Sequence, residues 1–311
     1  MAIVSIKNKT KSGSLLVGNS FYDPTRGLFG AGYSTTTVAT VDYITIATTG
    51  NATSFGDLTV GRYLLAGCSS STRGLFGGGF TPASNVIDYV TIATTGNAID
   101  FGDLTVSTRG LGACSSSTRG IFGGGYTTTY TKAIGYVTIA TTGNTTSFGN
   151  LTTATYQAIA CGSSTRGLFG GGDTGANTNT IEYITIATTG DATDFGDLTV
   201  AREKTSSCSS STRGLWLGGS TGSYSNVIDY VTIASTGNAT DFGDLTMAAG
   251  QGAASSSSTR AVNALGEQAG VGTLNIIEYV TIATTGNSTD FGDLTVARGY
   301  SGACSNGHGG L

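Results

Sequence analysis

Residues 112–153, GACSSSTRGIFGGGYTTTYTKAIGYVTIATTGNTTSFGNLTT, contain the pattern that decides the fold. The segment YVTIAT alternates β-branched and aromatic residues with smaller ones, which is typical of a half-buried strand. The turn signal TGN follows, and the next strand carries Phe148 and Leu151. Ahead of these, GACSS and GIFGGG predict two shorter strands, because glycine runs allow close backbone approach and a sharp bend. The stretch therefore predicts four short antiparallel strands and no helix.

The same pattern recurs six times along the chain. Its tyrosine stands at Tyr43, Tyr89, Tyr136, Tyr183, Tyr230 and Tyr279, with spacings of 46, 47, 47, 47 and 49 residues. A second marker, STRGLFGGG and its variants, places an arginine at Arg26, Arg73, Arg119, Arg166, Arg213 and Arg260. Four short strands in each unit of about 45 residues are typical of a propeller blade. We expect an all-β, six-bladed β-propeller over residues 23–311, preceded by an extended, basic arm over residues 1–22. A disordered leader or an extra strand is the alternative for these first residues.

The end of the sequence predicts how the ring closes. Segments equivalent to the first strand of the unit occur near residues 66–70, 112–116, 159–163, 206–210, 252–257 and 301–306. The last of them, in SGACSNGHGGL, is a surplus strand without a second strand after it. We therefore expect residues 301–306 to complete the blade that begins at Arg26, which would remove exposed sheet edges.

The repeated residues are expected to have structural roles. The small-residue strand suits the crowded position nearest the axis, and the tyrosines and phenylalanines suit the space between blades, where full burial stabilises by roughly 1.5–3 kcal/mol each. Four cysteines lie five residues before a repeat arginine, and a fifth follows in the last segment: Cys68, Cys114, Cys161, Cys208 and Cys304. One thiol per unit indicates buried cysteines on equivalent strands rather than a disulfide framework or a zinc site.

Composition argues against several function classes. The net charge is −4 without a basic stripe, which argues against nucleic acid as the main partner. No apolar run approaches the roughly 20 residues of a membrane span, and the first residues lack the pattern of a signal peptide. The single histidine is His308, and the repeated DFGD carboxylates, such as Asp100 and Asp103, are interpreted as structural turns rather than acid–base pairs or a calcium loop. We expect no catalytic residues, no metal and no cofactor.

The unit resembles the kelch repeat, on the residues GACSSSTRGIFGGG followed by a tyrosine strand and an aromatic-bearing strand. The resemblance covers roughly residues 23–311 and implies a propeller fold, but fold alone does not imply function. The chain departs from the kelch pattern in having phenylalanine where tryptophan is usual, in a slightly short period, and in a degraded sixth unit, STRAVNALG at residues 258–266. The leader and the repeats GLFGGG…YVTIATTGNATDFGDL also resemble structural and fibre proteins of marine bacteriophages, especially those of cyanobacteria.

Sequence variation is concentrated in two of the four connectors of each unit. The turn between the first two strands and the turn between the last two hardly change, whereas the other two connectors differ from unit to unit. Because the chain reverses at every strand, both variable connectors are expected on one face, where a rigid scaffold would present a binding surface; neutral drift in unpacked loops is the alternative. The candidate binding residues are Tyr63, Phe80, Tyr126, Tyr130, Tyr156, Asp173, Glu203, Lys204, Tyr224 and Tyr300.

Together these features favour a non-enzymatic virion protein of the tail-fibre or capsid-decorating type. The resemblance to phage proteins implies that the arm attaches the chain to other virion proteins, while the variable face binds a glycan or protein on the host surface. Two alternatives stay open: an intracellular kelch-like protein-interaction adaptor and a glycan-processing enzyme. The pattern leaves the ligand, the place on the particle and the oligomeric state open.

Overall fold

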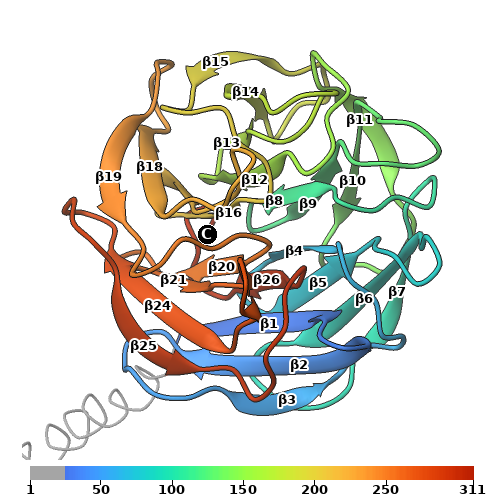
Figure 1. The fold of residues 1–311 in the computed structure, drawn as a ribbon. Helices are drawn as coiled ribbons and strands as arrows, with labels where there is room; N and C mark the ends of the chain where they lie inside the picture. Colours follow the sequence, from blue (N-terminus) through green and yellow to red (C-terminus); the bar gives the residue numbers. More distant parts are fainter. Residues whose placement is uncertain (1–24) are drawn as a thin grey trace, which may run out of the picture.

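The structure, a computed structural model, describes residues 25–311, so that the expected arm over residues 1–22 lies outside the described residues. The described chain forms six sheets of four antiparallel strands, arranged as the blades of a propeller around a central axis (Figure 1). This arrangement confirms the predicted all-β fold with six blades and four strands in each blade.

The blades contain the following strands, from the axis outward. Blade 1 contains β26 (Gly302–Ser305), β1 (Arg26–Tyr33), β2 (Thr37–Thr45) and β3 (Thr53–Asp57). Blade 2 contains β4 (Ala66–Ser69), β5 (Arg73–Gly77), β6 (Val86–Thr91) and β7 (Ile99–Asp103). Blade 3 contains β8 (Gly112–Ser115), β9 (Arg119–Gly123), β10 (Ala133–Thr138) and β11 (Thr146–Asn150).

The second half of the ring repeats this order. Blade 4 contains β12 (Ile159–Gly162), β13 (Arg166–Gly170), β14 (Thr180–Thr185) and β15 (Thr193–Asp197). Blade 5 contains β16 (Ser206–Ser209), β17 (Arg213–Leu217), β18 (Val227–Thr232) and β19 (Thr240–Asp244). Blade 6 contains β20 (Ala253–Ser256), β21 (Arg260–Ala264), β24 (Ile276–Thr281) and β25 (Thr289–Asp293).

The C-terminal strand closes the ring, as the surplus segment predicted. Strand β26 pairs antiparallel with β1, with Leu28 opposite Cys304 and Phe29 opposite Ala303. Blade 1 therefore takes its innermost strand from the end of the chain and its other three strands from the beginning. Without β26, the inner edge of β1 would have no strand to pair with.

The core lies between adjacent blades. Between blades 2 and 3, for example, Leu75 and Phe101 pack with Phe122 and Val137 in one buried cluster. The repeat phenylalanines are buried as predicted, whereas the repeat tyrosines are only partly buried and meet them edge to face, with 5.9 Å between the ring centroids of Tyr43 and Phe55.

The cysteines are buried free thiols on the innermost strands, as expected. Four of the five lie against a glycine of the next blade: a Cβ added to Gly120, for example, would lie 2.9 Å from Sγ of Cys68. Burial raises the pKa of the Cys114 thiol to about 12 and that of Cys208 likewise. The thiols therefore stay protonated at neutral pH and act as small packing groups.

One face of the ring carries the repeated turns, and we call it the turn face. Each repeat arginine lies over the tyrosine of its own blade and donates to a carbonyl of the next blade, as Arg26 Nη1 does to Ile92 O over 2.9 Å. Arg260 completes the ring with a 3.0 Å bond to Ile46 O. The DFGD segment is structural too, but through its backbone: the Asp103 amide donates to Oδ1 of Asn144 in the next blade over 2.9 Å.

The last residues cover the central channel on the turn face, and Figure 1 shows the C-terminus at the centre of the ring. His308 Nε2 lies 3.0 Å from Ser69 O, and the Gly309 amide donates to Ser209 O over 2.9 Å. Small cavities of about 50 and 60 Å³ remain along the channel. Among residues 25–311 there is no helix long and apolar enough to cross a membrane.

Candidate functional site

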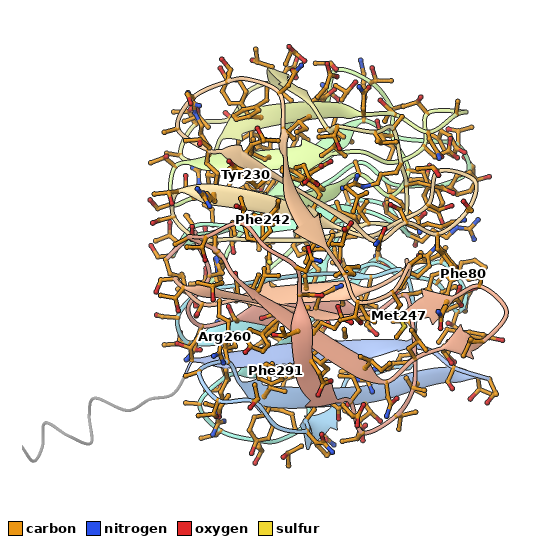
Figure 2. All side chains as sticks on the ribbon, turned by 60° about the vertical axis from the view of Figure 1, so that its left-hand side comes forward. Phe80, Tyr230, Phe242, Met247, Arg260 and Phe291 are labelled. Atoms are coloured by element: carbon orange, nitrogen blue, oxygen red, sulfur yellow. The ribbon has the colours of Figure 1, made fainter. Side chains whose placement is uncertain are left out.

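The variable connectors share the face opposite the turn face, as the alternation of strand direction predicted. We call this the loop face; it consists of six blade loops, each joining the second and third strands of a blade, and six linkers, each joining one blade to the next. Figure 2 shows Phe80 of a blade loop and Met247 of a linker on one side of the ring, with Arg260 of the turn face on the other.

Each linker pairs with the loop of the blade that it enters. The residue pairs are Tyr33–Gly299, Tyr63–Phe80, Arg109–Tyr126, Tyr156–Asp173, Glu203–Ser220 and Gly250–Glu267. In the second of them, the amide of Phe80 donates to Tyr63 O over 2.8 Å. Each linker comes from one blade and pairs with the loop of the next. The twelve residues therefore form a continuous belt around the axis.

A ring of strained backbone lies inside this belt, and we call it the collar. Six equivalent linker residues have φ near +60°: Leu64, Gly110, Gln157, Lys204, Gln251 and Tyr300. Five of the six inter-linker hydrogen bonds form, including Gly110 N to Leu64 O (2.8 Å) and Tyr300 N to Gln251 O (2.7 Å). Non-glycine residues adopt this conformation only when their surroundings hold it, so the belt is held in a defined geometry.

Two side chains of the collar close the mouth of the channel. Gln157 Nε2 donates to Oε1 of Gln251 over 3.1 Å, and both side chains are buried. With the C-terminal residues at the other end, the channel is covered on both faces.

The aromatic residues of the belt, together with the adjacent Tyr130 and Tyr300, form two clusters. In the first, the Tyr63 ring lies 5.4 Å from Tyr33, 5.6 Å from Phe80 and 5.7 Å from Tyr300, measured between ring centroids. All four side chains keep part of their surface exposed. Such partly exposed rings offer flat apolar surface beside polar hydroxyl groups.

In the second cluster, Tyr130 and Tyr156 stack with their rings 5.9 Å apart, and Tyr126 meets both rings edge-on. Gly110 allows this packing, because a Cβ there would lie 2.2 Å from the Tyr156 ring. Burial raises the pKa of Tyr156.

Arg109 connects the two clusters. Its guanidinium carbon lies 4.4 Å from the centroid of the Phe80 ring and 4.7 Å from that of Tyr126. Two cation–π contacts hold the side chain between the rings. The aromatic part of the belt is therefore continuous from blade 1 to blade 4.

The other half of the belt is acidic and hydrogen-bonded. Tyr130 donates to Asp173 Oδ2 over 2.6 Å, and Glu203 pairs with Lys204 at 2.9 Å. Glu267 accepts from Tyr224 over 2.7 Å and from Tyr300 over 3.1 Å. Burial, followed by the hydrogen bond to Glu267, raises the pKa of Tyr224.

Eight of the ten residues predicted as binding candidates lie in the belt or collar, and the other two, Tyr130 and Tyr224, pair with the belt residues Tyr126 and Ser220. Among the belt residues with aromatic or charged side chains, the prediction missed Tyr33, Arg109 and Glu267. Arg109 was detectable from its spacing, since it stands 46 residues after Tyr63 and 47 before Tyr156. Glu267 lies in a short hairpin, β22 (Glu267–Gln268) and β23 (Gly272–Thr273), within the blade loop where the sixth unit departs from the repeat.

The chemistry of the belt suits noncovalent recognition. It offers aromatic faces, one guanidinium and several carboxylates within a single ring, a combination suited to ligands with hydroxyl or amide groups. His308 lies at the turn-face end of the channel and takes no part in the belt. Within residues 25–311, no three His, Cys, Asp or Glu side chains are placed to hold a metal ion together.

Comparisons with known proteins add no identification. No family model matches the chain, and no curated protein matches it in sequence.

Proposed function

We propose that this protein acts by binding rather than by catalysis, and that the belt of the loop face is its binding surface. The observation that carries the proposal is the continuous run of partly exposed side chains from Tyr33 through Arg109 to Tyr156, held on a closed ring. Preorganised aromatic side chains cost little conformational entropy when they bind a ligand, which favours recognition of a glycan or a protein.

The proposed setting is a virus particle, with the chain as a tail-fibre or capsid-decorating protein. This setting is supported by the resemblance of the repeats to kelch-like proteins of marine phages. Residues 1–22 lack the repeat pattern, and we propose that they attach the propeller to other virion proteins. The host-surface glycan or protein would then be the ligand of the belt.

Mass spectrometry of purified particles tests the setting. We expect the chain in stoichiometric amounts in the particle; its absence from particles but presence in infected-cell extracts would instead support the intracellular kelch-like adaptor.

A glycan array, paired with a host-protein pull-down, tests the surface. We expect Tyr126→Ala and Tyr224→Ala to reduce binding. Thr142→Ala, an exposed substitution in a turn-face turn, should leave it unchanged. Equal binding by the wild type and both loop-face variants would favour neutral drift of the loops.

A further inference from the structure

Three blade junctions contain the same buried ion pair. Arg62 Nη1 lies 2.9 Å from Asp88 Oδ2, and the corresponding distances are 3.1 Å for Arg202–Asp229 and 3.0 Å for Arg298–Asp42. In each pair a linker arginine enters the blade that follows and meets a carboxylate on its third strand. The second guanidinium nitrogen donates to a second-strand carbonyl, as Arg62 Nη2 does to Phe76 O over 3.0 Å.

The junction between blades 3 and 4 has the carboxylate without the arginine. Thr155 occupies the repeat position of Arg62, and Glu182 occupies that of Asp88. The Glu182 side chain is buried, and its hydrogen bonds come from the amide and hydroxyl of Thr152. A cavity of about 120 Å³ lies beside it, lined by Thr155, Glu182 and Phe169, the counterpart of Phe76.

The other two junctions without an arginine differ from this one. Between blades 5 and 6, Glu278 receives an additional hydrogen bond from Ser288, and the buried Leu274 stands at the repeat position of Thr178, which lines the blade 3–4 cavity. Between blades 2 and 3, a cavity of about 120 Å³ is present, but Gly135 replaces the carboxylate. Only the blade 3–4 junction therefore combines a cavity with a buried carboxylate that has neither arginine nor serine as a partner.

We propose that the cavity between blades 3 and 4 is a binding site for a guanidinium group. The three filled junctions show what fits: a planar cation that bonds a third-strand carboxylate on one side and a second-strand carbonyl on the other. A buried carboxylate is stabilised strongly when a cation with matching hydrogen-bond geometry pairs with it. Arginine-type groups meet this need better than ammonium ions because their donors form a rigid fork.

The cavity is reached from the loop face. Its lining includes Thr153 of the linker and Thr174 of the blade loop, and both are exposed. The guanidinium can come from a small free alkylguanidine or from an arginine side chain on a protein partner. The site is independent of the proposed aromatic binding surface, because none of the belt's aromatic residues lines the cavity.

Isothermal titration calorimetry with methylguanidinium tests the site directly, with tetramethylammonium at equal ionic strength as the control cation. We expect saturable binding of methylguanidinium alone, weakened about tenfold or more in Glu182→Gln, which keeps the shape but removes the charge. A second titration, with N-acetylarginine amide, distinguishes an arginine side chain of a protein partner from a small free guanidine as the ligand. Its binding would indicate an arginine of a partner, and its failure beside methylguanidinium binding would indicate small free guanidines. No binding of methylguanidinium to the wild type would overturn the proposal.

A matched pair of variants tests the same geometry without a ligand. Thr155→Arg should restore the ion pair with Glu182, raise the melting temperature by a few degrees and abolish methylguanidinium binding. Thr108→Arg places the same side chain in the equivalent cavity between blades 2 and 3, where Gly135 provides no carboxylate, and should lower the melting temperature. Equal destabilisation by both substitutions would contradict the proposal.

Discussion

The hydroxyl of Tyr130 donates a hydrogen bond to Oδ2 of Asp173 over 2.6 Å and joins the loops of two neighbouring blades. This bond, with smaller effects of burial and of the Asp173 charge, raises the pKa of Tyr130 to about 12 from its ordinary value of 10. The neutral phenol therefore favours the folded state below pH 10, and this contribution is lost as the pH rises through about 12.

Asp173→Asn should bring the pKa of Tyr130 back toward 10, because an amide accepts a hydrogen bond without the repelling charge. The ¹³Cζ resonance of Tyr130, followed by NMR against pH, measures the shift. A wild-type Tyr130 that titrates near 10 would show that the two loops are not joined in this way in solution.

The tail that covers the channel should be sensitive to acid. His308 donates from Nε2 to Ser69 O, and its Nδ1 accepts from the Gly310 amide over 3.0 Å, so protonation of Nδ1 removes the second bond. Burial lowers the pKa of His308 below its ordinary 6.5. Because the unfolded chain then binds the proton more readily, stability is retained above pH 6.5 and lost as the pH falls through the folded-state pKa.

We expect hydrogen exchange of residues 306–311 to accelerate between pH 7 and pH 5, after correction for the intrinsic rate. His308→Gln should remove that acceleration, since glutamine does not titrate. The same pH dependence in the variant would assign the effect to another group.

Removal of the closing strand should unfold the ring at a much lower temperature. Deletion of residues 300–311 removes β26, exposes the edge of β1 and opens the cluster that Cys304 shares with Leu28 and Phe76. Deletion of residues 309–311 keeps β26 and should have a smaller effect. Calorimetry measures both; an unchanged melting temperature after the longer deletion would contradict closure by β26.

Removing one partner of a buried ion pair should destabilise the fold more than replacing both partners with apolar residues. Arg62→Met leaves the Asp88 carboxylate buried without its partner and should destabilise the fold by about 3–5 kcal/mol. Adding Asp88→Leu should recover part of this loss, because no buried charge then remains. Denaturant unfolding followed by the fluorescence of Trp216, the single tryptophan, gives both values. Equal destabilisation by the single and double substitutions would show that the pair is not coupled.

The repeat allowed most of the architecture to be predicted from sequence. The repeat predicts the closing strand over residues 301–306, and β26 spans Gly302–Ser305. The alternation of strand direction likewise predicts that the variable connectors share one face. Periodicity carries this information because equivalent residues must occupy equivalent places around a closed ring.

Contacts between distant units were not predictable in the same way. Gln157 and Gln251 meet although 94 residues separate them, and no pattern in either unit indicates the other. Arg109 is hard to recognise from sequence because its segment, STRG at residues 107–110, has the same letters as the turn that bears the repeat arginine. The missing arginine beside Glu182 becomes meaningful only when the structure shows the pairs at the other junctions.

The proposed function requires that ligands bind to the loop face and that the turn face serves only the scaffold. The most direct measurement is the affinity of the double variant Tyr126→Ala/Tyr156→Ala for a ligand identified on the array, beside Thr142→Ala/Thr188→Ala on the turn face. We predict a loss of about tenfold or more, equal to about 1.4 kcal/mol, in the first variant and no change in the second. An unchanged affinity in the loop-face variant, or an equal loss in the turn-face variant, would contradict the account.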